Sequence, residues 1–245
     1  MADFISKSLL KEKASEFGVE LDEKALERFD IYARLLVDWN EKINLTAITE
    51  PDEIVIKHFV DSLTVFSSIN IPKGSKVIDV GTGAGFPGVA MLIARPDLDV
   101  TLMDSTNKKL NVIRDILENM GLEADVVHKR AEEAGQSKDF REQYDFATAR
   151  AVSNLRDLSE FCLPFVKVGG TFISMKSAKA DEEIEEGIKA ISVLGGKIRE
   201  KKTFPLDTAG ERTIILIEKF SSTPGKYPRP SAKMVKNPIR KCRKR

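Results

Sequence analysis

Residues 77–88, with the sequence VIDVGTGAGFPG, constrain the fold of this chain more than any other segment. A short β-branched run ends in an acid, Asp79, and glycine then recurs at every second position as far as Gly85. Glycine allows positive φ angles and close approach of the backbone, and Pro87 suits the first turn of a helix. The segment therefore predicts a strand, a tight turn and a helix in direct succession.

Short β-branched runs alternate with helical stretches from residue 74 onward, which predicts βαβ units and a mainly parallel sheet. The predicted strands are 76–79, 100–104, 124–128, 146–149, 170–175, 197–204 and 212–218. The predicted helices between them are 88–94, 107–119, 154–163 and 181–194. No helix separates the last two strands, which indicates an antiparallel hairpin at one edge of a seven-stranded sheet.

Two ligand classes fit the glycine-rich turn. Residues 83–88 match the G-x-G-x-x-G pattern of dinucleotide enzymes, whereas the D-x-G-x-G-x-G pattern starting at Asp79 is typical of methyltransferases that use S-adenosylmethionine (AdoMet). Asp104, at the end of the second predicted strand, can accept both ribose hydroxyls in either class. An acid suits the cationic sulfonium of AdoMet, and the terminal hairpin is typical of the AdoMet methyltransferase fold. We therefore expect AdoMet, with an NAD-dependent oxidoreductase as the alternative.

The first 70 residues are predicted to be helical. Apolar residues recur at helical spacing before Gly18, again after a candidate N-cap at Asp22, and again after Pro51. We therefore expect an N-terminal helical extension at 1–70, an AdoMet-binding α/β domain at 71–220 and a basic tail at 221–245.

The net charge of +1 conceals a strongly uneven distribution. Residues 224–245 hold nine basic side chains and no acidic one, whereas the other 223 residues hold 30 basic and 38 acidic side chains, a net charge of −8. Such an asymmetry predicts contact with a polyanion. A disordered or solubilising end is the alternative, and a membrane surface is disfavoured because the tail has no amphipathic apolar face.

Targeting, cysteine and metal signals are weak. No apolar run approaches the roughly 18 residues of a membrane span, and the N-terminus lacks a secretory signal pattern, so we expect a soluble cytoplasmic protein. Cys162 and Cys242 are the only cysteines, and no Cys/His spacing indicates a metal site. Cys162 lies in an apolar helical stretch and is expected in the core rather than as a nucleophile.

Five segments in fixed order carry a family resemblance: 44–46 (NLT), 58–63 (HFVDSL), 79–88, 149–152 (ARAV) and 226–229 (KYPR). Together they resemble the glucose-inhibited division protein B family of bacterial 16S ribosomal RNA guanine-N7 methyltransferases. The resemblance implies a Rossmann-like AdoMet methyltransferase fold and methyl transfer from AdoMet to a guanine N7 in the 530 loop. It also implies a 16S rRNA or small-subunit precursor as partner; we expect a monomer without metal or membrane contact. Methylation of another RNA or a small molecule is the alternative.

The candidate site residues come partly from the turn and partly from the resemblance. Asp79, Gly81 and Gly83 follow from the turn, and Asp104 follows from the end of the second predicted strand. The resemblance assigns further cofactor contacts to Phe86, Ser105, Thr106, Ala131, Glu132 and Arg150. RNA contacts are expected at Lys226, Arg229, Lys233 and Lys236. The family pattern is broken at Lys176-Ser177 and by the Pro230-Ser231-Ala232-Lys233 start of the tail extension.

Methylation of guanine N7 needs little catalytic machinery. N7 offers a lone pair on the major-groove edge and carries no proton, so no general base is required. Holding the reactants in line supplies most of the acceleration. We expect Arg150 and Lys176, at the ends of the fourth and fifth strands, to position them, with a surface ion pair as the alternative for Arg150. His58 could serve the site or the packing, and His128 is expected to be structural.

Overall fold

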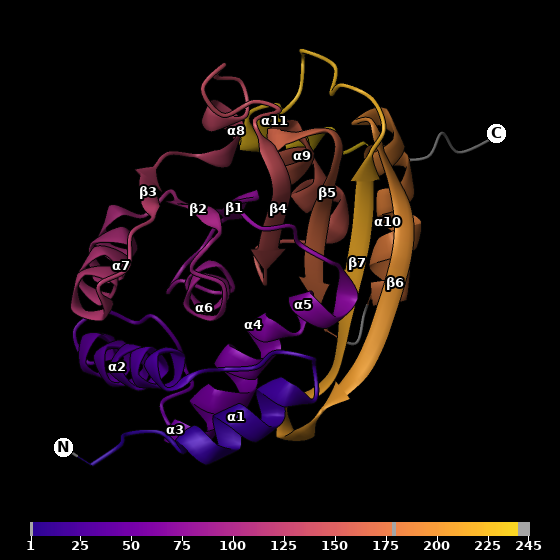
Figure 1. Ribbon diagram of the computed structural model, residues 1–245. Coiled ribbons are helices and arrows are strands. Elements are labelled where there is room, and N and C mark those ends of the chain that lie inside the picture. The colour runs from indigo at the N-terminus through magenta and orange to yellow at the C-terminus, as the bar shows by residue number, and fades with distance from the viewer. Residues whose placement is uncertain (1, 178–179, 240–245) are drawn as a thin grey trace.

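The computed structural model describes residues 2–177 and 180–239 and contains one seven-stranded sheet (Figure 1). The strand order is β3-β2-β1-β4-β5-β7-β6, with parallel pairing from β3 to β5 and antiparallel pairing of β7 with both neighbours. The strands are β1 Lys76–Val80, β2 Asp99–Asp104, β3 Asp125–His128, β4 Tyr144–Arg150, β5 Val166–Lys176, β6 Gly196–Leu206 and β7 Gly210–Lys219. This arrangement confirms the predicted fold class.

The predicted strand positions are correct, but several strands are longer than predicted. β5 starts four residues earlier than expected, because Val166 pairs with Tyr144 before the register shifts and Thr171 pairs with Phe146. β6 and β7 also continue to a tight turn, where Leu206 pairs with Gly210. A propensity pattern does not show such extensions, because neighbouring strands supply the hydrogen bonds that maintain them.

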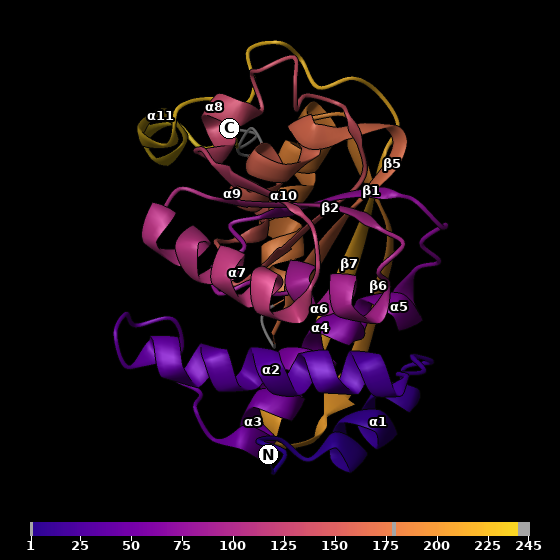
Figure 2. The ribbon, with the colours of Figure 1, turned by 60° about the vertical axis from the view of Figure 1, so that its left-hand side comes forward.

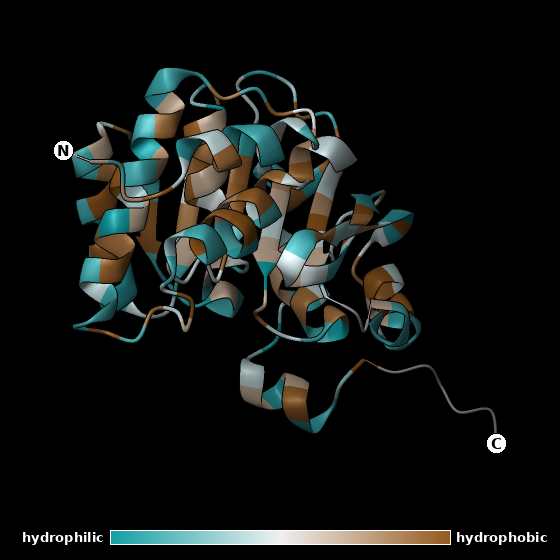
Figure 3. Cartoon of the chain, turned by 90° about the horizontal axis from the view of Figure 1, so that it is seen from below, coloured by the Kyte–Doolittle hydropathy of each residue, from teal (hydrophilic) through white to brown (hydrophobic). Residues whose placement is uncertain are grey.

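Helices cover both faces of the sheet. On one face lie α6 (Gly88–Ala94) and α7 (Asn107–Met120), and on the other lie α9 (Leu155–Cys162) and α10 (Ala180–Val193). Each pair encloses its own apolar core against the sheet. Figure 3 shows the result as apolar inner surfaces and polar outer surfaces on the helices.

The N-terminal helices form an additional layer outside α6 and α7. α2 (Glu23–Asn40) packs against both of them and lies below α7 in Figure 2. Its N-cap Asp22 accepts a hydrogen bond from the backbone N–H of Ala25, as expected of that position. α1 (Lys7–Ser15) lies beside it. The single helix expected after Pro51 is instead divided into α3 (Pro51–Ile54), a π-helical turn (Val55–Val60), α4 (Asp61–Leu63) and α5 (Val65–Ser68).

The far end of the β6–β7 hairpin returns to these first helices. The ring centroids of Phe17 and Phe204 lie 5.3 Å apart, and Lys13 pairs with Asp207 at 3.1 Å. Ile214 of β7 belongs to the same apolar core as Leu10 of α1. The helical extension and the α/β unit therefore share one core.

The chain after β7 runs back across α8 (Ala131–Ala134) and α9 and then forms α11 (Ser231–Lys236) (Figure 1). Arg141 donates hydrogen bonds to the carbonyls of Thr223 and Tyr227, and Gln136 donates to the carbonyl of Pro228. These contacts fix the segment before α11 against the body of the protein.

Candidate functional site

A cavity of about 550 Å³ opens at the carboxyl ends of β1, β2, β3 and β4. The strand order reverses between β1 and β4, and in open α/β sheets ligands bind at such a switch point. The loops after these four strands supply most of the wall. Other parts of it come from the N-terminal region (Leu45, Thr46 and His58), from α9 (Phe161) and from α11 (Ser231). Its volume falls within the roughly 300–1,000 Å³ typical of small-molecule sites.

Two glycines of the turn after β1 could not easily be replaced. Gly81 has a φ of +74° and lines the cavity, and a Cβ atom there would lie 2.8 Å from a methyl group of Val152. Gly85 has a φ of +105°, and its Cβ would lie 2.6 Å from the Tyr32 hydroxyl, which donates to the carbonyl of Ala84. The turn is therefore tight because of both its backbone angles and its neighbours.

Asp79 lies beneath the turn rather than in the cavity, which corrects the expectation of a direct cofactor contact. Its Oδ2 accepts hydrogen bonds from the Gly88 backbone N–H at 2.9 Å and the Thr82 hydroxyl at 2.7 Å. Complete burial raises the pKa of Asp79 to about 6, although these two hydrogen bonds oppose the shift. The carboxylate holds the start of α6 against the end of β1 and so sets the shape of the turn.

Asp104 links the turns after β1 and β2. Its Oδ2 accepts from the Gly83 backbone N–H at 3.0 Å, and its Oδ1 accepts from the Thr106 backbone N–H at 2.8 Å. A carboxylate oxygen can accept more than one hydrogen bond, so both oxygens keep capacity for a ligand's hydroxyl groups. Asp104, Ser105 and Thr106 all line the cavity; the ribose contact of Asp104 stays a prediction.

The end of the cavity beyond β3 is closed by a residue from the C-terminal segment. Ala131 and Glu132 line this end, and the Ser231 hydroxyl donates to Glu132 Oε1. Ser231 belongs to the stretch in which the sequence departs from the family pattern. The difference from the family sequence pattern therefore affects the cavity as well as the tail.

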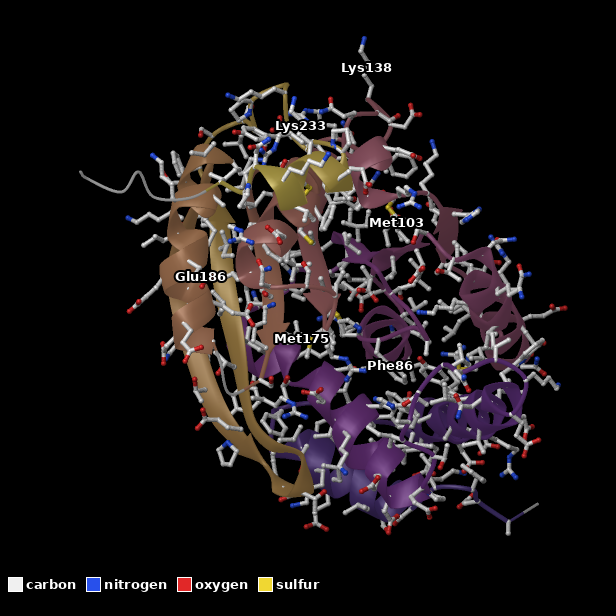
Figure 4. The ribbon with its side chains drawn as sticks, turned by 180° about the vertical axis from the view of Figure 1, so that it is seen from behind. Phe86, Met103, Lys138, Met175, Glu186 and Lys233 are labelled. Carbon is white, nitrogen blue, oxygen red and sulfur yellow. The ribbon has the colours of Figure 1, made fainter. Side chains whose placement is uncertain are left out.

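Arg150 forms the opposite end of the cavity. Its Nη1 lies 2.9 Å from Asp61 Oδ2, and its guanidinium stacks 4.8 Å from the Phe86 ring, which lies inside the protein between the N-terminal helices and the sheet (Figure 4). His58 stacks on Phe86 with ring centroids 4.5 Å apart. The ion pair is enclosed, because the Arg150 and Asp61 side chains are only 14% and 7% exposed. The surface ion pair considered for Arg150 is therefore not what the structure contains.

A second cavity of about 430 Å³ adjoins the first and shares His58, Arg150, Ala151 and Val152 with it. Lys176 lines only this second cavity, with its Nζ 2.8 Å from Glu183 Oε2. Arg212 also lines it and pairs with Asp61 at 3.2 Å. Arg212 was not predicted from the sequence, because its role depends on a hairpin that returns to the N-terminal helices.

The four residues expected to bind RNA have different surroundings. Lys233 and Lys236 are exposed on α11, and Figure 4 shows Lys233 at the periphery. Lys226 lies over the Tyr227 ring at 5.2 Å. The Arg229 guanidinium is instead bound in a two-point ion pair to Glu160, at 2.8 and 2.7 Å. The basic positions Arg240, Lys241, Arg243, Lys244 and Arg245, together with Cys242, lie outside the described residues.

Two further side chains considered from the sequence make contacts within the protein. His128 Nε2 contacts the Ser105 carbonyl at 3.1 Å, and Cys162 is completely buried, which raises its thiol pKa well above the ordinary value and confirms its predicted place in the core. Residues 2–177 and 180–239 contain no group of three or more His, Cys, Asp or Glu side chains arranged to hold a metal ion. No helix in those ranges is long and apolar enough to cross a bilayer.

The chain matches the family model GidB, rRNA small subunit methyltransferase G, over residues 25–214. It is 48% identical over 224 residues to the ribosomal RNA small subunit methyltransferase G of Lachnoclostridium phytofermentans, covering 91% of this chain and 93% of that protein. Identity to the protein of the same name from Bacillus thuringiensis is 48% over 237 residues, covering 96% and 97%. A solved Bacillus halodurans structure classed as a methyltransferase shares the fold, with a TM-score of 0.50 and 16% identity over 66% of this chain and 99% of the other.

Proposed function

The chain belongs to the GidB family of rRNA small subunit methyltransferases G, and from this premise we propose that it methylates N7 of a guanine in 16S rRNA with AdoMet as the methyl donor. The observation that carries the proposal is the first cavity, which nine of the ten expected cofactor residues line. Asp79, the tenth, supports the turn from below.

The cavity residues suit the three parts of AdoMet. Glu132, after β3, lies at the end where this fold class holds an adenine, and Asp104, after β2, offers two carboxylate oxygens to a ribose. Gly81 and Gly83, after β1, leave the middle of the cavity free of side chains. The amino-acid part then extends toward Arg150, after β4. An anionic carboxylate beside Arg150 and a neutral adenosine beside Glu132 and Asp104 match the charges of these walls.

The reaction requires positioning rather than proton transfer. AdoMet, when bound, supplies an electrophilic methyl group on a sulfonium, and the bond from methyl to N7 forms as the bond to sulfur breaks. N7 has no proton to lose, so the chain needs no general base. His58 is held neutral, because burial first and the nearby Arg150 charge second lower its pKa to about 3, and both its ring nitrogens are hydrogen-bonded. Its role is to hold the Arg150 end of the cavity in shape; correct alignment can contribute on the order of 7–11 kcal/mol.

The second cavity is the proposed entry for the target guanine. It meets the first cavity at Arg150, where the methyl group would face it, and Lys176 and Arg212 offer donors to an acceptor such as guanine O6. Glu183 and Asp61 leave acceptors for the N–H groups on the opposite edge of the base. Arg150 and Lys176 are therefore positioning residues in this proposal.

The basic tail supports an RNA partner. Exposed Lys233 and Lys236 on α11 stand beside the cavity that Ser231 helps to enclose. Removing residues 240–245 deletes five basic residues without touching this α11. We expect RNA binding to weaken and to become less salt-dependent, by roughly 0.7–0.9 in the log–log slope for each phosphate that the shortened chain no longer neutralises. An unchanged slope would exclude these residues from the interface.

Labelled AdoMet and 16S rRNA, either naked or within small ribosomal subunits, test the proposed activity. Aniline cleavage should map a single 7-methylguanine in the 530 loop. Arg150→Met should lower transfer by at least about 100-fold, because the reactants lose their alignment. Arg95→Met is a matched control, since Arg95 also forms an ion pair, with Asp97, but lies outside both cavities. Methylation of neither RNA form, together with binding of NAD in place of AdoMet, would overturn the proposal.

A further inference from the structure

Four side chains form a continuous hydrogen-bonded series that ends at the wall of the first cavity. Asp61 Oδ2 accepts from Arg150 Nη1 at 2.9 Å, and Arg150 Nη2 lies 3.2 Å from His58 Nδ1. The opposite ring nitrogen, His58 Nε2, lies 2.9 Å from the Thr46 hydroxyl oxygen. The series begins at a buried carboxylate and reaches a half-buried hydroxyl in the cavity wall.

The direction of each hydrogen bond follows from the chemistry of the groups. A guanidinium can only donate, so His58 Nδ1 must accept from Arg150. A neutral imidazole that accepts at one nitrogen carries its proton on the other. His58 Nε2–H therefore donates to Thr46 Oγ1.

Thr46 Oγ1 receives a second donor, the backbone N–H of Ile48 at 3.0 Å. A hydroxyl has two acceptor positions and one hydrogen, so both acceptor positions are occupied and the hydrogen remains to be donated. Across residues 2–177 and 180–239, no protein acceptor is paired with this hydrogen. Since Thr46 lines the cavity, the hydroxyl acts there as a donor only.

The position of Thr46 identifies the acceptor. Glu132 and Asp104 line the cavity at the adenosine side, and Thr46 lies with His58 and Arg150 at the other side. In AdoMet the group farthest from the adenosine is the amino acid, whose ammonium donates and whose carboxylate accepts. We propose that the Thr46 hydroxyl donates a hydrogen bond to the α-carboxylate of AdoMet, an inference that rests on the proposed function.

The same series makes the hydroxyl a better donor. Arg150 polarises the His58 ring, which in turn donates to Thr46, and hydrogen bonds in such a chain strengthen one another. A bond to a carboxylate is charge-assisted and stronger than one between neutral groups. Asp61 also pairs with Arg212 in the second cavity, so it fixes the base-side and cofactor-side donors together.

Calorimetry with three non-reacting ligands tests the inference without requiring turnover. S-adenosylhomocysteine retains the carboxylate, 5′-methylthioadenosine lacks the whole amino acid, and S-adenosyl-3-thiopropylamine lacks only the carboxylate. Thr46→Val should weaken S-adenosylhomocysteine binding by about 10- to 100-fold and leave the other two ligands within about twofold. Thr46→Ser should restore binding. Thr203→Val, which removes a hydroxyl from the β6–β7 hairpin, should leave all three unchanged.

Thr46→Val leaves two donors, His58 Nε2–H and the Ile48 backbone N–H, without an acceptor and could misfold for that reason. A second variant therefore repeats the test. Thr46→Ala makes room for water to satisfy them, and it should show the same selective loss. Equal losses for all three ligands, or full S-adenosylhomocysteine affinity with reduced RNA methylation, would overturn the inference and assign the hydroxyl to packing or to the guanine. If the unaltered protein binds none of the three ligands, the AdoMet assignment itself fails.

Discussion

Replacing Arg229 with alanine should destabilise the protein, because the Arg229 side chain is the partner of a buried carboxylate. A basic tail predicts that its guanidinium contacts phosphate, but the structure places it in a bidentate pair with Glu160, whose carboxylate is only 2% exposed. Glu160 Oε1 also accepts from the Arg229 backbone N–H at 2.9 Å. The pair fixes the chain just before α11 to α9.

The cost of removing this side chain can be worked out from its partners. Arg229→Ala leaves a buried carboxylate with one backbone donor, and breaking a buried pair on one side costs about 3–5 kcal/mol. The retained backbone donor places the expected loss near the lower limit, about 3 kcal/mol. Arg28→Ala is the matched control. Among the described residues, half-buried Arg28 donates hydrogen bonds to the carbonyls of Met120 and Gly121 and pairs with no carboxylate, so we expect a loss below about 1 kcal/mol.

Urea unfolding, followed by circular dichroism, measures the free energy of unfolding of both variants. Glu160→Gln, which removes the charge of the other partner of the ion pair, is measured in the same way. If Arg229 is structural, Glu160→Gln also destabilises the protein and does not raise RNA affinity. Full stability of Arg229→Ala, combined with a salt slope lower by about 0.7–0.9, would refute this reasoning and return Arg229 to the RNA interface.

Three further predictions follow from buried groups and the glycine turn. Burial lowers the pKa of Lys219 to about 8, so the unfolded chain binds more protons than the folded chain between pH 8 and 10.5. The free energy of unfolding should therefore rise by about 3 kcal/mol across that window. Lys219→Met should abolish this rise in urea titrations carried out at several pH values. Asp79→Ala should weaken S-adenosylhomocysteine binding in calorimetry together with a loss of about 1–3 kcal/mol of stability; weakened binding at full stability would instead indicate direct contact. Gly81→Ala should lower both melting temperature and ligand affinity, because its Cβ meets Val152. Gly121→Ala, which shares a positive φ but has no atom within 4 Å of its Cβ, should affect stability alone.

The alternation of apolar periods was sufficient to predict the sheet and its covering helices. Strand and helix patterns are local, and the cap at Asp22 and the turn before Pro87 depend only on neighbouring residues. The break of the helix after Pro51 was missed, because apolar residues continue at helical spacing through the π-helical turn. Its packing against other elements, rather than its composition, determines where the helix changes its winding.

The cavity residues that could be predicted are those that follow a strand with a recognisable sequence pattern. Asp104 and Gly81 are recognisable in this way, and the resemblance added Glu132 and Arg150. Thr46 appeared in a family signature without a role, because its function depends on His58, twelve residues later. The burial of Arg229 could not be predicted, since Glu160 is distant in sequence and the surrounding tail is uniformly basic.

The return of the β6–β7 hairpin to α1 has a consequence for synthesis on the ribosome. The first helix and Phe17, which follows it, leave the exit tunnel long before Phe204 and Ile214. Phe17 nevertheless packs against Phe204, and α1 shares a core with Ile214. Contacts across such sequence separations slow folding, since the loop between them must close first. The apolar faces of the N-terminal helices therefore remain incompletely covered until nearly the whole chain has been translated.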